Sequence, residues 1–521
     1  MAVHWLVLVF STALLVAGAI RLREKTMPIT PPQATERTAL LGIFLAAYSV
    51  RHIIVFGPST SPVLGVGHFG FSVLLDAVSV ILLLLISILA WVILRFSATH
   101  LQGEQREGRF TFWVCFTLAG FVLLVTAGNL VQLGLGWMGT AIGANRLVIF
   151  YSDRPGARRA ARKNIVFARA AVLTLAAGLL LLYGAYGASD IASINAAARA
   201  GFVPPAAVLA AAFLAVAAVL QTALIPVHGW LTEVIEAPTP VSALLNAGVV
   251  SAGGFLLIRF ADVMLGVPLI MAALVIVGGF SALVGSIVML TQSAAKTALA
   301  WSTVSQMGFI VLQCGLGLFP LALLHIVAHA LYKTHAFLIA PGAGHTIRAA
   351  RRLGPVAPPS ARNVALAMGI AITVYALVGF PLGLVEKSPQ AVALGAILVF
   401  GVGYLAAQGI ADAAPRELCM ATARASVLFV AMFFGFQWVS QTLTAGTLPP
   451  TPQAGPLEWM LIALTVFSFA AVAVFQSLLP LWSTHPAVRG LRVHAANGFY
   501  FNARADRTAG AWKINAPTKK T

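Results

Sequence analysis

The sequence has little charge, and most of the charge it has is of one sign. Of its 521 residues only 9% are charged and 60% are hydrophobic, and 33 Lys and Arg residues stand against 15 Asp and Glu residues. This composition excludes an ordinary soluble enzyme or binding domain and predicts a polytopic helical membrane protein. We expect the excess of basic residues to orient the chain in the lipid bilayer and to contact anionic lipid, and we predict no nucleic-acid partner.

Cysteines are also scarce. Cys115, Cys314 and Cys419 are far apart and each lies in or beside an apolar run, so the sequence indicates neither a disulfide framework nor a metal site. The sequence shows no nucleotide-binding glycine loop, nucleophile elbow or cluster of metal ligands. We therefore predict a transport subunit and not an enzyme, with no cofactor bound by this chain.

Apolar runs of spanning length recur along the whole chain and predict an all-α protein with about 14–15 transmembrane helices. The first run is followed, not preceded, by positive charge, so we interpret it as a membrane helix and not as a cleaved signal peptide. The expected spans are 2–20, 38–57, 72–95, 110–128, 129–151, 165–187, 205–226, 240–264, 267–291, 297–318, 319–340, 361–384, 388–411, 423–446 and 458–482.

Basic residues concentrate in the loops that follow odd-numbered spans. The positive-inside rule then places those loops in the cytoplasm and the N-terminus outside. The basic tail is too polar to span, and we expect it on the cytoplasmic side, as a docking segment for a partner or as a solvated, lipid-facing end. We divide the chain into N-terminal helices, a first antiporter-like half, a second such half, C-terminal helices and the tail, at 1–70, 72–264, 267–411, 412–485 and 486–521.

Two stretches rich in proline interrupt this pattern, at 226–240 and at 379–389. In hydrocarbon, freed backbone groups and carboxylates are costly unless protein or a water-lined cavity satisfies them, so broken helices of this kind favour a passage for ions. Paired breaks in two halves predict two inverted repeats with the site at their interface. The carboxylates and the lysine in or beside these breaks are Glu233, Glu236, Glu386 and Lys387.

A stripe of ionisable residues marks the span 319–340. His325, His329 and Lys333 follow one another at intervals of four, which places them on one face of a helix. A lysine in mid-membrane costs roughly 2.5–3.5 kcal/mol on insertion scales, which favours a function for it. Histidine titrates near neutral pH, so such groups bridged by water can pass a proton. The alternative is that the histidines cap carbonyl groups and the lysine reaches the membrane surface.

Other ionisable residues are weaker candidates. Lys296 opens the span 297–318 and either reaches the interface or feeds the same relay. Glu386 and Lys387 are either an exit to the outer face or a surface ion pair. Possible further members of the pathway are His228, Glu233, Glu236 and Asp76.

These residues carry a resemblance to a known family. The stretch Pro226-Val-His-Gly-Trp-Leu, followed by Glu236-Ala-Pro-Thr-Pro-Val-Ser-Ala-Leu-Leu, resembles a signature of the proton-conducting antiporter-like subunits of respiratory complex I and Mrp antiporters. The stretches around Lys296 and around 325–333 resemble the second-half signatures of that family. Within it, the segments 228–231, 247–259 and 312–317 are most similar to the membrane subunits of DAB inorganic-carbon pumps.

The resemblance implies a partner, a DabA-like cytoplasmic subunit similar to a β-carbonic anhydrase, which carries the zinc. It implies that this chain, in the inner membrane of a bacterium, supplies ion-gradient energy so that CO2 hydration by the partner accumulates bicarbonate. The alternatives are an antiporter subunit of a complex I-like or Mrp-type assembly, and a structural membrane anchor.

The resemblance also assigns roles to residues. Five positions match the family's second-half relay and its lysine on the second broken helix: Lys296, His325, His329, Lys333 and Lys387. The first half departs, because Met138, Gln221 and Asn246 stand where the family has glutamate, lysine and histidine. We therefore expect a single proton route, through the second half.

Overall fold

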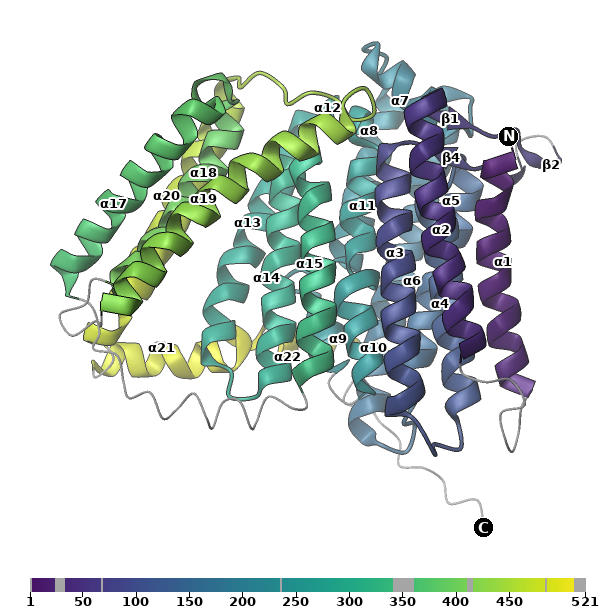
Figure 1. Cartoon of the computed structure of the whole chain (residues 1–521), viewed down its shortest axis with the longest axis horizontal. Coiled ribbons are helices and arrows are strands. Elements are labelled where there is room, and N and C mark those ends of the chain that lie inside the picture. The colour runs from purple at the N-terminus through teal and green to yellow at the C-terminus, as the bar shows by residue number, and fades with distance from the viewer. Residues whose placement is uncertain are drawn as a thin grey trace.

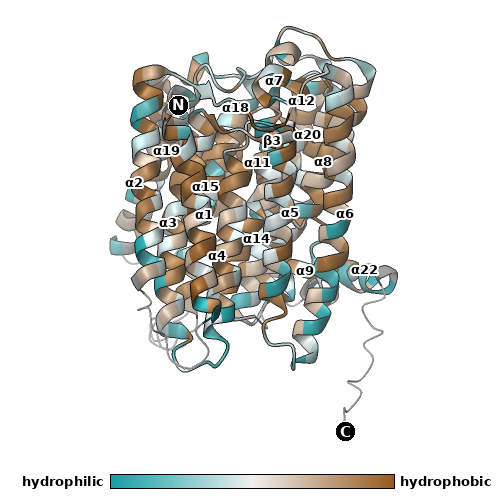
Figure 2. Cartoon of the chain, turned by 90° about the vertical axis from the view of Figure 1, so that its right-hand side faces the viewer, coloured by the Kyte–Doolittle hydropathy of each residue, from teal (hydrophilic) through white to brown (hydrophobic). Residues whose placement is uncertain are grey.

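The structure, a computed structural model, describes residues 2–23, 33–66, 69–234, 237–340, 360–409, 416–482 and 485–509. Long helices stand side by side, and hydrophobic residues cover most of their length while polar residues gather around their lower ends (Figure 1 and Figure 2). Within the described ranges, 11 helices are long and apolar enough to cross a membrane. The chain is thus a multi-pass membrane protein with an all-α fold, as its composition predicts.

Each of the fifteen expected spans corresponds to helical structure. Fourteen are long helices: α1 (Ala2–Arg23), α2 (Gln33–Phe56), α3 (Ala77–His100), α4 (Glu107–Val125), α5 (Leu130–Val148), α6 (Pro155–Tyr186), α8 (Pro205–Gln221), α13 (Pro268–Thr291), α14 (Ala295–Gly315), α15 (Phe319–Ile339), α17 (Ala361–Gly379), α18 (Pro389–Gly409), α19 (Arg416–Thr444) and α20 (Pro456–Trp482). The remaining span is built from four shorter pieces: α10 (Thr239–Leu244), η2 (Leu245–Val249), α11 (Ser251–Arg259) and α12 (Ala261–Leu265).

Both proline-rich stretches lie between helices, and the two broken helices stay a prediction. After α8 ends, the chain makes turns and one short helix, α9 (Gly229–Thr232), before α10 begins. Pro240 sits in the first turn of α10, where a missing N–H group is tolerated. The π-helical turn η2 follows, a feature common at functional sites. In the second break, α17 gives way to the 3-10 turns η4 (Phe380–Leu382) and η5 (Leu384–Glu386). The inverted repeats stay a prediction.

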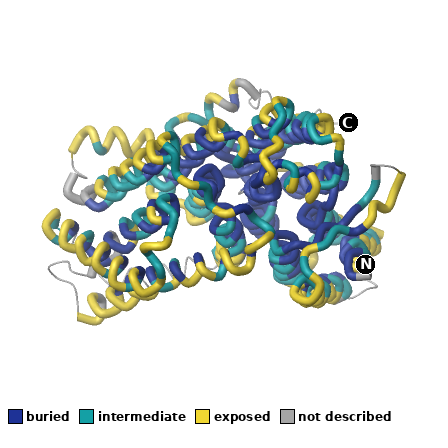
Figure 3. Tube along the Cα trace, turned by 90° about the horizontal axis from the view of Figure 1, so that it is seen from above, coloured by how far each residue is buried: buried dark blue, intermediate teal, exposed yellow. Residues whose placement is uncertain are grey.

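The most buried part of the bundle lies around the first break. The segment from Thr239 to Arg259 is 94% buried, whereas the window in α19 is 22% buried. Figure 3 shows the same contrast, with buried residues concentrated in the central helices and exposed residues on α17–α20 at the left. Glycines let helices approach closely here: a Cβ added at Gly278 in α13 would lie 2.6 Å from the Gly308 carbonyl oxygen in α14.

Small elements close the two ends of the bundle. At the upper end in Figure 1 lie α7 (Ile191–Arg199) and two short antiparallel ladders, which pair β1 (Ser59–Thr60) with β4 (Leu74–Leu75) and β2 (Leu64–Val66) with β3 (Phe69–Phe71). At the lower end, which we call the basal face, lie α9, α21 (Pro486–Ala496), η6 (Gly498–Tyr500) and α22 (Phe501–Ala509). The described part of the tail thus folds into helices along the bundle.

Candidate functional site

Lys333 on α15 is fully buried. Its ammonium group donates hydrogen bonds to the Leu299 carbonyl oxygen at 3.0 Å and to the Ser302 hydroxyl at 2.7 Å, both on α14. In the described part of the chain no carboxylate forms an ion pair with it. Because the side chain has no exposed surface, it does not reach the membrane surface as the alternative interpretation requires. A buried ammonium group whose hydrogen-bond acceptors are all neutral is suited to losing and regaining a proton.

His329 lies one turn before Lys333 and is 4% exposed. Neither of its ring nitrogens has a hydrogen-bond partner among the described residues. Buried polar groups normally have hydrogen-bond partners, so we expect water molecules to bind this imidazole. The His325 ring lies one turn further on, with 6.5 Å between the two ring centroids, so a proton passing between the rings needs a bridging water.

His325 is held by two glutamines of α14. Its Nδ1 lies 3.0 Å from the Gln313 Oε1 atom and its Nε2 lies 2.7 Å from the Gln306 Oε1 atom. A cavity of about 540 Å³ between α14, α15, α18 and α19 is lined by mostly apolar side chains and reaches His325 and Gln313. The structure thus places the predicted stripe along one helix, with His325 and Lys333 held by residues of α14.

Lys296 belongs to the same helix as these acceptors. It is half-buried near the start of α14, and its ammonium group donates to the Thr239 hydroxyl at 3.2 Å. This bond ties α14 to α10 directly after the first break. Lys296 therefore faces the broken segment, although no hydrogen bond joins it to Lys333 in the described chain.

The residues of the second break stand apart from this group. Glu386 is exposed and Lys387 is partly buried. Within the described ranges, neither side chain has a hydrogen bond or ion pair that joins it to the stripe or to the other. The outer exit and the surface ion pair both stay predictions.

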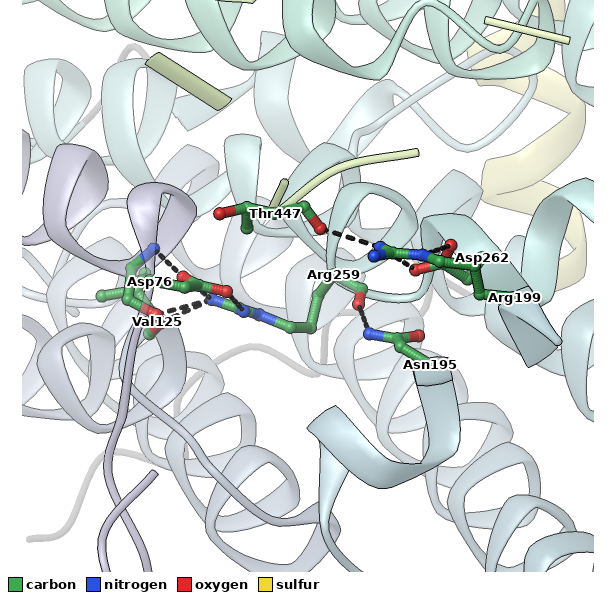
Figure 4. A network of polar contacts seen from close by, with 8 residues as sticks. Asp76, Val125, Asn195, Arg199, Arg259, Asp262 and Thr447 are labelled. Atoms are coloured by element: carbon green, nitrogen blue, oxygen red, sulfur yellow. Dashed lines mark hydrogen bonds and ion pairs between the residues drawn. The ribbon is translucent and has the colours of Figure 1, made fainter. Parts of the chain in front are cut away.

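Asp76 does not lie inside a membrane helix, as the expected span 72–95 implied. Strand β4 precedes it, and its carboxylate caps the N-terminus of α3 by accepting a hydrogen bond from the Ser79 amide at 2.7 Å. It also pairs with Arg259 of α11 at 2.6 Å, and Arg259 donates further to the Ser79 hydroxyl and the Val125 carbonyl (Figure 4). These contacts join α3, α4 and α11, so Asp76 has a structural partner.

A second ion pair lies beside the first. Arg199 of α7 donates to both carboxylate oxygens of Asp262, at 2.8 and 3.0 Å, and to the Thr447 carbonyl at 3.1 Å (Figure 4). The hydrogen bond and charge of Asp262 raise the pKa of Arg199. The backbone carbonyl of Arg259 accepts a hydrogen bond from Asn195 and so connects the two pairs.

The first break carries a cluster that sequence reasoning missed. The expected span 165–187 leaves Lys163 in the preceding loop, but α6 begins at Pro155, a favoured first-turn residue, and Lys163 is only 1% exposed. Its ammonium group pairs with Glu233, at the end of α9, and with Asp506 of α22. The helical spacing of Arg159 and Lys163 was the available signal; the pairing with Asp506, 343 positions along the chain, had none.

His228, directly before α9, is fully buried. Its ring lies 4.6 Å from the Trp301 ring, centroid to centroid, and neither ring nitrogen has a partner among the described residues. Burial, with a contribution from the Lys163 charge, lowers the pKa of His228 to about 4. Glu236 lies outside the described residues.

Three positions of the first half are not built for titration. Gln221 donates to the Val249 carbonyl at 3.0 Å, and Asn246 donates to the Ser242 carbonyl at 2.9 Å within the π-helical region. Met138 is 40% exposed and lines a surface cavity of about 460 Å³ between α5 and α6. In this chain these side chains satisfy backbone groups or face outward.

Comparison with known proteins identifies the family. A family model described as "NADH:quinone oxidoreductase/Mrp antiporter, TM" matches residues 127–387. The probable inorganic carbon transporter subunit DabB2 of Halothiobacillus neapolitanus is 34% identical over 476 residues, which are 90% of this chain and 86% of that protein. The chain belongs to the DabB branch of this family. The probable inorganic carbon transporter subunit DabB of Hydrogenovibrio crunogenus is 38% identical over 289 residues, 55% of each chain.

Solved structures show the same fold. A chain of the Mrp complex from Dietzia sp. DQ12-45-1b superposes with a TM-score of 0.62 at 21% identity, over 98% of this chain and 61% of that one. A chain of respiratory complex I from Thermus thermophilus superposes with a TM-score of 0.56 at 20% identity, over 95% of this chain and 99% of that one. The resemblance stated from the sequence motifs is therefore confirmed at the level of family and fold.

Proposed function

We propose that this chain is the proton-conducting membrane subunit of an energy-coupled inorganic-carbon pump. The names of its DabB relatives support the substrate class. The observation that carries the proton pathway is the fully buried Lys333. Among the described residues its hydrogen-bond acceptors are all neutral, and His329, one turn away, has no hydrogen-bond partner. Burying a lysine and an imidazole in this way costs folding free energy, and a chain that only anchors its partner does not need these buried groups.

The pathway runs along the face of α15 that meets α14. Lys333 gives its proton to water beside His329, and the Ser302 hydroxyl and the Leu299 carbonyl hold the lysine nitrogen in place during the exchange. His329 passes the proton by water to His325, whose ring is oriented by Gln306 and Gln313. Each step needs water between the groups, because the two imidazole rings are too far apart for a direct bond.

The partner in this proposal is a DabA-like cytoplasmic subunit that resembles a β-carbonic anhydrase and carries zinc. Proton flow through the membrane subunit would keep CO2 hydration in the partner running in one direction. The location is a bacterial inner membrane, with the N-terminus outside and the basal face, where the basic tail lies, toward the cytoplasm. Purification distinguishes this from a complex I-like or Mrp-type assembly: a zinc-containing partner supports the pump, and quinone-reductase or several antiporter subunits oppose it.

Growth provides the test. Cells that lack carbonic anhydrase and carry this chain with its partner should grow in ambient air, and Lys333→Ala should abolish that growth. His335→Ala is the matched control, because His335 lies on the same helix, two residues further on, and is exposed. It should grow like the wild type at equal membrane abundance. Growth of the Lys333→Ala cells at the wild-type rate would refute the pathway.

A further inference from the structure

The C-terminal helices are seated on the basal face by specific contacts. The Gln292 side chain donates to the Ala496 carbonyl at 3.3 Å, and Phe501 meets Phe280 edge to face with 6.0 Å between ring centroids. Gly498 adopts φ +60 and lies against Trp301, where an added Cβ would come within 2.8 Å of the indole ring. These contacts guide α22 back across the base to α6 and α9.

There α22 enters a buried cluster of charges. Lys163 pairs with both Glu233 and Asp506, and its Nζ lies 3.1 Å from the Asn502 Oδ1 atom. The amide of Asn502 donates to Glu233 at 2.8 Å, and Arg159 donates to the other oxygen of Glu233 at 3.2 Å. Asp506 is 3% exposed, although it comes from a polar tail. The ammonium group is thus enclosed by three oxygen atoms, and α22 supplies two of them.

The cluster borders the part of the chain that leads to Lys333. Gly229 packs under Asn502, where an added Cβ would collide with the amide oxygen, and the preceding residue is the unpartnered His228. The His228 ring lies against Trp301 of α14. The next residue on α14 is Ser302, which accepts the hydrogen bond from Lys333. His228 and Lys333 therefore contact two consecutive residues of α14, which places the cluster and the buried lysine on the same helix.

We propose that Lys163, Glu233 and Asp506 form a proton-exchange site at the basal end of the Lys333 pathway, and that α22 completes this site by supplying Asp506. Two carboxylates around one ammonium group can hold a proton at an oxygen or at the nitrogen. No family position assigned above includes Asp506. This inference rests on the proposed proton conduction and names the place where the proton enters or leaves it.

The exchange is balanced in two steps. A proton from the basal solution forms an O–H bond on Asp506, which removes one negative contact from Lys163. The N–H bond of Lys163 then breaks, and its proton passes through water and forms an N–H bond on the His228 ring. The O–H bond of Asp506 breaks in turn, and its proton returns to the Lys163 nitrogen. One proton has moved inward from the base, and the charges of the cluster are restored.

The test measures proton flux with a pH-sensitive dye in liposomes that contain the full chain and its partner. Asp506→Asn keeps the shape of the side chain but cannot titrate, and we expect its flux to fall at least about tenfold, in line with the loss of one acid–base group. Asp506→Glu should retain most of the flux. Arg507→Gln, at the exposed neighbouring position of α22, is the matched control and should stay within about twofold of the wild type.

An engineered disulfide distinguishes two effects of a substitution at Asp506: loss of the docking of α22 and loss of the titratable carboxylate. Gln292→Cys with Ala496→Cys brings two thiols together only when the C-terminal helices are seated, because the Gln292 side chain contacts Ala496, and it leaves the contacts of the Lys163 cluster intact. In this cross-linked background, loss of flux on Asp506→Asn supports the exchange site, and a flux that Asp506→Asn leaves unchanged overturns it. If wild-type flux depends on Lys333 but not on Asp506, only this inference fails; if the wild type carries no proton flux, both proposals fail.

Discussion

Two regions of the bundle present polar side chains at related places but use them differently. Around the first break, Gln221 and Asn246 donate to backbone carbonyls of the π-helical region. Around α14 and α15, His329 has no partner in the described chain and Lys333 has only neutral ones. The first arrangement satisfies backbone carbonyl groups of an irregular helix, and the second leaves titratable groups free to exchange protons. Along α14 and α15, unsatisfied or weakly satisfied titratable groups therefore mark the proposed pathway, whereas burial alone does not.

The largest expected effect tests this difference by removing a buried charge that has an ion-pair partner. Arg259→Leu leaves Asp76 buried without its partner, and loss of one member of such a pair typically costs about 3–5 kcal/mol of the free energy of unfolding. Thermal unfolding in detergent should show a large loss of stability, with flux per folded molecule unchanged. Arg199→Leu is the control, because Arg199 is 47% exposed and its pair is worth about 1 kcal/mol or less. Equal unfolding temperatures for Arg259→Leu and wild type would contradict this role.

A paired substitution tests the comparison directly. His329→Leu should lower proton flux at least about tenfold, because no other titratable group replaces it between its neighbours on α15. Asn246→Leu removes a group that serves the local backbone, and its flux should stay within about twofold of the wild type. Flux is measured in liposomes at equal protein content. A larger loss from Asn246→Leu than from His329→Leu would reverse the assignment of the two regions.

A smaller effect on proton flux should follow when one hydrogen bond to the Lys333 nitrogen is removed. Ser302→Ala removes one of the two acceptors of Lys333, and water replaces it only in part, so we expect flux to fall about threefold to tenfold. Ser305→Ala makes the same change one turn further along α14, where the hydroxyl donates to the Ala282 carbonyl instead. Flux measurements should give a lower rate for Ser302→Ala than for Ser305→Ala. Equal rates for the two variants would show that Ser302 does not act through Lys333.

The smallest effect is expected at Met138. Its side chain faces a surface cavity and not the pathway, so Met138→Leu should change flux by less than about twofold and stability by less than about 1.5 kcal/mol. The same liposome assay and thermal unfolding measure both. A strong loss of flux would mean that a route through the first region exists that its neutral residues do not reveal.

Much of this architecture follows from local sequence patterns. Length and hydropathy located the long helices that the structure describes, and the four-residue spacing of His325, His329 and Lys333 placed them on one helix face, as the structure confirms. The helix limits were less accurate where polar residues occupy a helix end. Lys163 was placed in a loop because the charged first turns of α6 lower its hydropathy, and Asp76 was placed in a helix because an apolar strand precedes it.

Local sequence patterns could not predict contacts between segments that are far apart in the chain. The partner of Asp76 lies 183 positions away in Arg259, and the tail residue Asp506 meets α6 from far along the chain. Such pairs depend on how helices pack, and no spacing in the sequence encodes them. The tail is expected to dock on a partner or to face solvent and lipid, and both alternatives stay predictions. Its described residues contact the bundle at Ala496 and Phe501, while most of α21 is exposed.

The seating of α22 has a consequence for biogenesis. Every membrane helix that the structure describes precedes α22 in the chain and is synthesised before it. If Asp506 completes the exchange site, a nascent chain already threaded into the bilayer lacks the final acid and remains non-conducting until the ribosome has delivered it. The order of translation would then protect the cell's membrane potential from half-made copies.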